Sequence, residues 1–135
     1  MTVYVCLDDR NGMLFNNRRQ SRDKAVLADL QAGLTGVLFA DGFSEKLLTG
    51  ADVPWSPAPE RLTDLPMDSC FFLENRKPEE ALEAASMLVI YRWNRHYPSD
   101  VRWEADMADW GFALTETTEF PGSSHETITK EVYRK

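Results

Sequence analysis

Histidine and cysteine are both scarce in this chain, which has two of each among 135 residues. His96 and His125 lie 29 residues apart, and neither has a cysteine within metal-ligand spacing. A structural zinc site needs four cysteine or histidine ligands in close pairs. We therefore expect no metal site. Cys6 and Cys70 stand in apolar stretches, where buried, reduced thiols are the expected state, so we also expect no disulfide.

Long apolar runs are absent as well. The strongest run, Ser86 to Tyr91, is far shorter than the roughly 20 residues that a membrane-spanning helix needs. The N-terminal residues reach Asp8 and Asp9 without the basic and then apolar pattern of a signal peptide. We therefore expect a cytoplasmic protein that has no membrane partner.

Positive charge is in deficit, because 15 Lys and Arg oppose 22 Asp and Glu and give a net charge of -7. An acidic protein repels nucleic acid and anionic membranes, so binding to either would need a local basic patch. Hydrophobic residues make up 43% of the chain, which excludes disorder as its dominant state. The length suits one core, and we expect a single domain over residues 1–135.

Four short runs of apolar and β-branched residues predict buried strands. They are Val3–Leu7, Gly36–Ala40, Ser69–Leu73 and Met87–Tyr91. Between them, capping residues, proline and buried-face spacing predict helices. These run from about Arg22 to Gly33 with Ser21 as the cap, from Ser44 to Leu48, and from Pro78 to Ala85. This order predicts an α/β fold in which the early strands are parallel.

The C-terminal part alternates apolar and polar residues over Gly111–Thr115 and Thr127–Tyr133, which favours antiparallel strands near a sheet edge. Gly122–Glu126 is interpreted as the turn of this hairpin. We expect two residues of the last strand to face the core and to pair with two of the preceding strand, namely Ile128 and Val132 with Phe112 and Leu114. The fold class predicted is an α/β sandwich with a mixed sheet.

Three arginines, Arg18, Arg19 and Arg22, gather just before the first predicted helix. Backbone N–H groups and the helix dipole already favour an anion at a helix start. The cluster therefore predicts a site for a small anionic ligand. The alternative is that these arginines lie in a solvated loop or pair with nearby acids, which are Asp8, Asp9 and Asp23.

A second stretch interleaves basic and aromatic side chains, namely Arg92, Trp93, Arg95, His96 and Arg102. Such side chains can hold phosphates and stack on bases, so the stretch supports nucleic-acid binding as an alternative function. The competing interpretation is that the aromatic rings close a sheet edge while the arginines extend to solvent. The net negative charge of the chain favours this second interpretation.

Spacings that identify common enzyme classes are missing: the chain has no P-loop, glycine-rich dinucleotide motif, paired zinc ligands or nucleophile elbow. Asp23 falls in the first turn of the first predicted helix and is a candidate catalytic acid. An acid at this position more often stabilises the helix dipole. Whether the chain is an enzyme is left open by these observations.

Several segments together resemble the dihydrofolate reductase family. Val3–Gly12, an apolar strand followed by Asp-Asp-Arg-Asn-Gly, is similar to the family's first strand and the loop beside its substrate. Gly36–Phe39 stands where its second strand would be. The closing pattern is carried by Val101–Trp110, Leu114–Phe120 and Glu126–Arg134. The resemblance implies a dihydrofolate reductase-like sandwich and places Asp23 near the family's helix-borne catalytic acid.

The chain departs from that family where the cofactor NADPH would bind. The family has a Gly-Gly pair after the strand that is here Cys70–Leu73, and this chain has Glu74, Asn75 and Arg76 there. The Gly-Arg-x-Thr segment that holds the cofactor phosphate is replaced by Ala40–Ser44. Glu74 stands where the cofactor phosphates would come close to the backbone, and its negative charge would repel them. We therefore expect no cofactor. NADPH belongs only to the alternative in which the chain is a pteridine-type reductase with a remodelled site.

The segments Asn11–Asp23 and Gly122–Tyr133 also resemble a group of short bacterial proteins often labelled ribonuclease Z. That label implies a metallo-β-lactamase enzyme with a His-x-His-x-Asp-His zinc motif. Two histidines cannot build this motif, so the label does not guide the mechanism. The sequence predicts a non-redox domain that binds a small anionic ligand or a protein partner; the alternatives are the reductase and an RNA-binding or RNA-processing protein.

Overall fold

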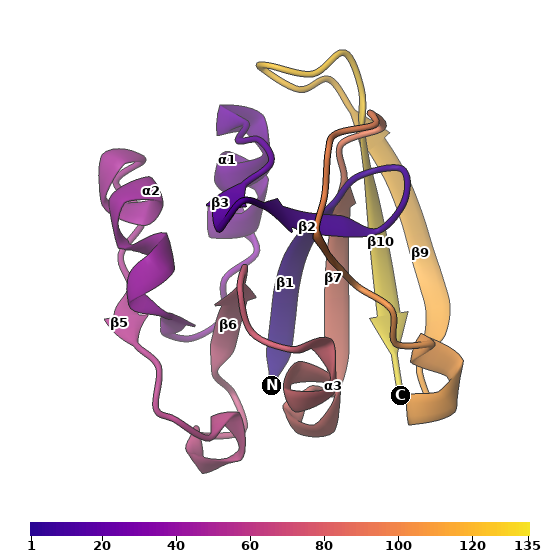
Figure 1. Ribbon diagram of the computed structural model, residues 1–135. Coiled ribbons are helices and arrows are strands. Elements are labelled where there is room, and N and C mark those ends of the chain that lie inside the picture. Colours follow the sequence, from indigo (N-terminus) through magenta and orange to yellow (C-terminus); the bar gives the residue numbers. More distant parts are fainter.

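A mixed sheet of seven strands runs through the computed structural model, which describes residues 1–135 (Figure 1). The strands are β1 (Thr2–Leu7), β4 (Leu38–Ala40), β5 (Ser56–Pro57), β6 (Cys70–Leu73), β7 (Met87–Arg92), β9 (Ala113–Phe120) and β10 (Ile128–Arg134). Their order is β5-β4-β6-β1-β7-β10-β9. The pairs among β1, β4, β5, β6 and β7 are parallel, whereas β10 pairs antiparallel with β7 and β9. The predicted fold class is confirmed.

A second, three-stranded sheet was not predicted. It consists of β3 (Arg18–Arg19), β2 (Gly12–Phe15) and β8 (Val101–Arg102), in that order. Asn16 and Asn17 form the tight turn between β2 and β3, with φ angles of 54° and 59° that asparagine tolerates better than most residues. The segments are short and β3 is polar, so no alternation marks them in the sequence.

Three α-helices cover the large sheet. They are α1 (Lys24–Ala32), α2 (Glu45–Gly50) and α3 (Pro78–Ala84), and the 3-10 turns are η1 (Gly42–Ser44), η2 (Leu62–Asp64) and η3 (Met107–Trp110). The predicted cap of α1 was wrong: the N-cap is Asp23, whose carboxylate accepts hydrogen bonds from the N–H groups of Ala25 and Val26. No helix has the length and apolar character required to cross a membrane.

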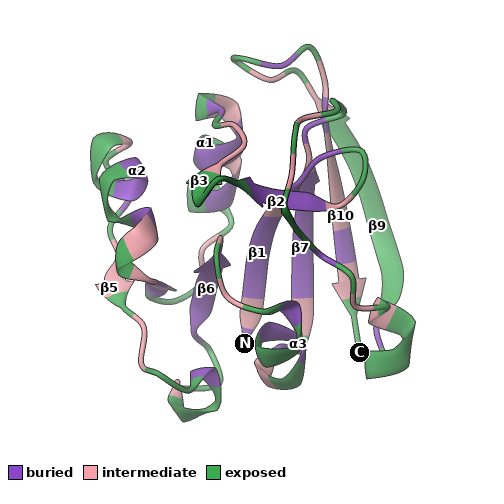
Figure 2. Cartoon of the chain, viewed as in Figure 1, coloured by how far each residue is buried: buried purple, intermediate pink, exposed green.

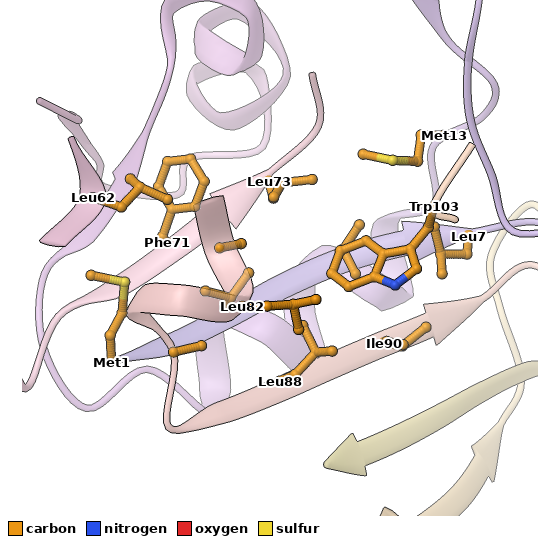
Figure 3. Packing of buried hydrophobic residues seen from close by; sticks show 14 of the residues in the cluster. Met1, Leu7, Met13, Leu62, Phe71, Leu73, Leu82, Leu88, Ile90 and Trp103 are labelled. Carbon is orange, nitrogen blue, oxygen red and sulfur yellow. The ribbon is translucent and has the colours of Figure 1, made fainter. Parts of the chain in front are cut away.

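Alternating side chains of the central strands contribute to two hydrophobic cores, one on each face of the sheet. Figure 2 shows the central strands β6, β1 and β7 as mostly buried and the edge strand β9 as exposed. On one face, Leu82 of α3 packs with strand residues and with Trp103, as Figure 3 shows. On the other face, Leu30 of α1 and Leu48 of α2 pack against Tyr4 and its neighbours. Because both faces are covered, the central strands are apolar throughout rather than alternating.

The C-terminal hairpin has a register different from the predicted one. Ile128 and Val132 are buried as expected, but they lie opposite Phe120 and Glu116 of β9. A bulge after Val132 shifts the register, so that Leu114 faces Tyr133. The expected pairing with Phe112 and Leu114 was therefore wrong. It assumed that the first strand ends at Thr115, whereas β9 runs on to Phe120 and the connecting loop is shorter than expected.

The position of β10 between β7 and β9 generates a stability prediction. Ile128 is fully buried, so Ile128→Ala should lower the free energy of unfolding by about 3 kcal/mol through lost burial and a residual cavity. Thr117→Ala, on the exposed strand β9, should change it by less than about 0.5 kcal/mol. Urea unfolding measures both values. Equal effects of the two substitutions would show that β10 does not contribute to the core.

Candidate functional site

The candidate site lies where the carboxyl ends of the parallel strands meet, the edge at which open α/β sheets bind ligands. The loop between β9 and β10 extends over this edge toward the start of α1 (Figure 1). A narrow cavity here is lined by residues that include Cys6, Ser21, Asp23, Glu74 and Trp93. Its free space is about 20 Å³, which is room for one water molecule.

Asp8, directly after β1, shapes the loop beside this cavity. Its buried carboxylate accepts hydrogen bonds from the N–H groups of Arg10, Gly12 and Tyr97 and from the Gln20 amide. Burial alone raises the pKa of Asp8, but these hydrogen bonds outweigh it and lower the pKa. A Cβ at position 12 would lie 2.8 Å from Asp8 Oδ2. Only glycine therefore allows the loop to close around this carboxylate.

Asp23 is the most heavily hydrogen-bonded side chain of the site. Besides capping α1, its oxygens accept from Ser123 N (2.9 Å), Ser123 Oγ (3.0 Å), Ser124 N (2.8 Å) and His125 N (3.1 Å). Burial raises the pKa of Asp23, but the hydrogen bonds from Ser123, His125 and Ser124 outweigh it, and the pKa is strongly lowered. Asp23 is therefore ionised at neutral pH and serves as an acceptor there. Its role as a catalytic acid stays a prediction.

His125 completes the contact with Asp23. Its Nδ1 lies 2.9 Å from Asp23 Oδ2, and its ring stacks on Trp93 with centroids 4.6 Å apart. On the other side of the ring, Nε2 lies 2.8 Å from the Tyr97 hydroxyl and 3.2 Å from Ser21 Oγ. Sequence reasoning missed this cluster, because His125 lies in a hairpin turn 102 residues from Asp23 and no local pattern connects them.

The three predicted anion-binding arginines are placed differently from one another. Arg19 forms a two-pronged ion pair with Glu74, with N–O distances of 2.7 and 2.8 Å. Arg18 is exposed on β3, and Arg22 is exposed beside the start of α1. Ser44 Oγ also donates to Glu74, at 2.7 Å. The guanidinium of Arg19 is therefore already bound to a carboxylate, whereas Arg22 is free.

A second ion pair lies near the carboxyl end of β4. Arg76 binds Asp41 through two hydrogen bonds of 2.7 and 2.8 Å and donates to the carbonyls of Pro59 and Glu60. With the Arg19–Glu74 pair, it joins the segments after β4 and β6. These are the segments in which the chain departs from the cofactor-binding residues of dihydrofolate reductases.

A wider groove opens between α1 and α2. Its volume is about 630 Å³, and it is lined by Arg22 and Lys24 near the start of α1, by Lys46 of α2, and by the apolar Leu27 and Leu47. None of its three cations forms an ion pair. The groove therefore places three unpaired cations around one recess next to the candidate site.

The residues of the predicted nucleic-acid stretch are divided between core and surface. Trp93 is buried against His125, and Arg92 pairs with Glu131 at 2.9 Å. Arg95, His96 and Arg102 are exposed. Nucleic-acid binding stays a prediction, with only these three exposed side chains available to carry it.

The hydrogen bonds of Asp23 generate a prediction of pH-dependent stability. Asp23→Asn removes the charge and faces an amide toward three N–H donors, so it should cost on the order of 3 kcal/mol at pH 7. Because the folded-state pKa is lowered below the unfolded value of about 3.9, the carboxylate stabilises the fold above that pH. This contribution is lost as pH falls further through the folded pKa.

Urea unfolding of parent and Asp23→Asn at pH 7, 4 and 2.5 measures this effect. The difference in free energy between them should shrink as the pH is lowered below 4. Asp9→Asn is the control, since Asp9 is exposed and its side chain makes no hydrogen bond. A difference that stays constant across this range would contradict the assigned role of the Asp23 charge.

Comparisons with known proteins agree with this architecture. The chain is similar in structure to a dihydrofolate reductase from Enterococcus faecalis complexed with NADP(H) and RAB-propyl, with a TM-score of 0.63 and 9% sequence identity. The match covers 98% of this chain and 94% of that one. No family model and no curated protein sequence matches the chain, so the resemblance to proteins labelled ribonuclease Z finds no support. The chain has a dihydrofolate reductase-like fold.

Proposed function

We propose that this protein binds a small anionic organic molecule in the groove between α1 and α2, without redox chemistry. The observation that carries the proposal is the set of three unpaired cations, Arg22, Lys24 and Lys46, around one recess. Arginine and lysine bind carboxylates and phosphates through charge-assisted hydrogen bonds. This arrangement suits a ligand that carries at least one such group.

The size and lining of the groove agree with this class of ligand. Its volume of about 630 Å³ lies within the range of about 300 to 1,000 Å³ that is usual for small-molecule sites. Leu27, Ala28 and Leu47 supply apolar surface, while the cations supply charge. Ligand pockets typically combine these two features, apolar contact area and a few orienting polar groups.

The charge of the groove contrasts with that of the whole molecule. The chain carries a net charge of -7, yet the only carboxylates along the groove are those of Asp23 and Asp52. The oxygens of Asp23 are occupied by hydrogen bonds from neighbouring groups. A local excess of positive charge in a recess attracts anions even when the net charge opposes them.

The ion pairs beyond the site support binding without NADPH. Arg19 neutralises Glu74, and Arg76 neutralises Asp41, so neither arginine is free for a cofactor phosphate. The observation that favours the alternative, a pteridine-type reductase, is the likeness to a dihydrofolate reductase complexed with NADP(H). At 9% identity that likeness supports the fold alone, so binding of NADPH is tested separately below.

Anion binding is tested by thermal unfolding of the full chain with citrate and with inorganic pyrophosphate. A ligand at 100 times its dissociation constant should add about 2.7 kcal/mol of stability. The double variant Arg22→Gln and Lys46→Gln should raise the dissociation constant at least about tenfold, because two charged donors are lost. Lys77→Gln, exposed before α3, is the matched control and should bind as the parent does. Equal binding by the double variant and the control would refute the proposal.

The reductase alternative is tested by titrating the protein with NADPH and following tryptophan fluorescence. We expect weak or no binding, because the Glu74 carboxylate and its ion pair with Arg19 occupy the phosphate approach. A dissociation constant in the low micromolar range or tighter would overturn the non-redox proposal and favour the reductase.

A further inference from the structure

We propose that Ser21 and His125, positioned by Asp23, hydrolyse small carboxylic esters through an acyl-enzyme intermediate. The three side chains form a continuous chain of hydrogen bonds: Ser21 Oγ lies 3.2 Å from His125 Nε2, and His125 Nδ1 lies 2.9 Å from Asp23 Oδ2. A hydroxyl, a base and a carboxylate that orients the base are the elements of nucleophilic acyl transfer. This activity lies beyond the proposed anion binding and does not depend on it.

The Asp23 carboxylate determines the state of the imidazole. Because an ionised carboxylate can only accept, the proton of the neutral His125 ring resides on Nδ1. Nε2 then presents a lone pair toward the Ser21 hydroxyl, as a general base requires. Stacking on Trp93, with an interplanar angle of 18°, further restricts the orientation of the ring. Asp23 is therefore a positioning residue, while Ser21 and His125 are the catalytic residues.

Asp23 itself is held by the surrounding backbone. It accepts from the N–H groups of Ser124 and His125 and from the hydroxyl of Ser123, so it cannot rotate away from the ring. Its side chain is 0% exposed and that of His125 is 1% exposed. Exclusion of water strengthens the interaction between the carboxylate and the imidazolium that forms during the reaction.

Tyr97 competes with Ser21 for the base. Its hydroxyl lies 2.8 Å from His125 Nε2 and 3.4 Å from Ser21 Oγ. The single lone pair of Nε2 accepts one strong hydrogen bond at a time. In the fraction of molecules in which the Tyr97 hydroxyl donates to Nε2, His125 cannot accept the Ser21 proton. Removal of the Tyr97 hydroxyl should therefore leave Nε2 free for Ser21.

Donors for the developing oxyanion are present next to the nucleophile. The backbone N–H groups of Ser21 and Arg22 donate no hydrogen bond within the protein. They precede the first turn of α1, whose dipole also favours negative charge. Ser21 is half-buried and lines the narrow cavity, which holds no more than one water molecule. The acyl group would therefore lie on the solvent side of Ser21, where a short one such as acetyl needs the least space.

The reaction balances with water as the only co-reactant. Ser21 Oγ attacks the carbonyl carbon and its proton passes to His125 Nε2. The bond from that carbon to the leaving oxygen then breaks, and the Nε2 proton transfers to the departing alcohol. A water molecule next attacks the acyl-Ser21 ester, gives its proton to Nε2, and releases the carboxylic acid. Ser21 Oγ takes the proton back from Nε2, which restores both residues.

The test uses the full chain with p-nitrophenyl acetate, and with a fluorophosphonate that labels activated serines by losing fluoride. We expect hydrolysis above the uncatalysed rate, and one label per chain that maps to Ser21. Ser21→Ala should abolish the label and lower the rate at least about 100-fold, the scale of a lost catalytic group. Ser56→Ala, on the distant edge strand β5, is the matched control and should retain both.

The variant Tyr97→Phe distinguishes a catalytic role of this cluster from a purely structural one. Both Ser21→Ala and Tyr97→Phe leave the bond between His125 and Asp23 in place, so both should fold and melt cooperatively. If Ser21 is the nucleophile, Tyr97→Phe should label faster with the fluorophosphonate than the parent. If the cluster only connects the hairpin to α1, the fluorophosphonate labels Ser21 in neither the parent nor Tyr97→Phe. Both proteins then hydrolyse the ester at the same rate as Ser21→Ala. That result would overturn the proposal whatever the groove binds.

Discussion

The carboxylate of Asp23 is the interaction on which the site depends. It receives seven hydrogen bonds: two from the first turn of α1 and five from Ser123, Ser124 and His125. One buried charge therefore joins a helix start to a loop near the opposite end of the chain. The cost of removing this charge from water is offset because both carboxylate oxygens accept several hydrogen bonds. Gly122 is part of the same arrangement, since a Cβ there would lie 2.6 Å from Asp23 Oδ2.

Charge at the carboxyl edge of the sheet is divided into two regions. Arg19 and Arg76 are bound to Glu74 and Asp41, and these pairs close the segments after β4 and β6. Arg22, Lys24 and Lys46 have no such partners and surround the groove between the helices. The difference has a simple physical basis: the two arginines beside half-buried carboxylates are neutralised, whereas the exposed cations at the start of α1 and on α2 keep their charge available for a ligand.

The fold by itself does not decide the chemistry. A dihydrofolate reductase-like sheet provides an edge at which strand ends, a helix start and a long hairpin loop converge, and function resides in the side chains placed there. In this chain those side chains are a carboxylate kept ionised, an imidazole with a fixed tautomer and a serine hydroxyl. They are suited to accepting and transferring protons, and the free cations beside them are suited to binding anions.

The sequence by itself determined the main elements and the fold class. Apolar runs such as Val3–Leu7 and Met87–Tyr91, and the alternation over Thr127–Tyr133, predicted strands because periodicity within one segment reports which faces are buried. The same local reasoning predicted α2 and α3 closely. It could not predict the register of β9 with β10, because a one-residue bulge leaves no signal in composition.

Only the tertiary structure decided which side chains meet at the site. Arg19 and Glu74 are 55 residues apart, and Ser21 and His125 are 104 apart, so neither pair produces a spacing that can be recognised. The expected cap, Ser21, gave way to Asp23 because the carboxylate satisfies donors of the hairpin as well as those of α1. Local patterns encode burial and helix ends, whereas long-range hydrogen bonds form only when folding brings distant loops to one sheet edge.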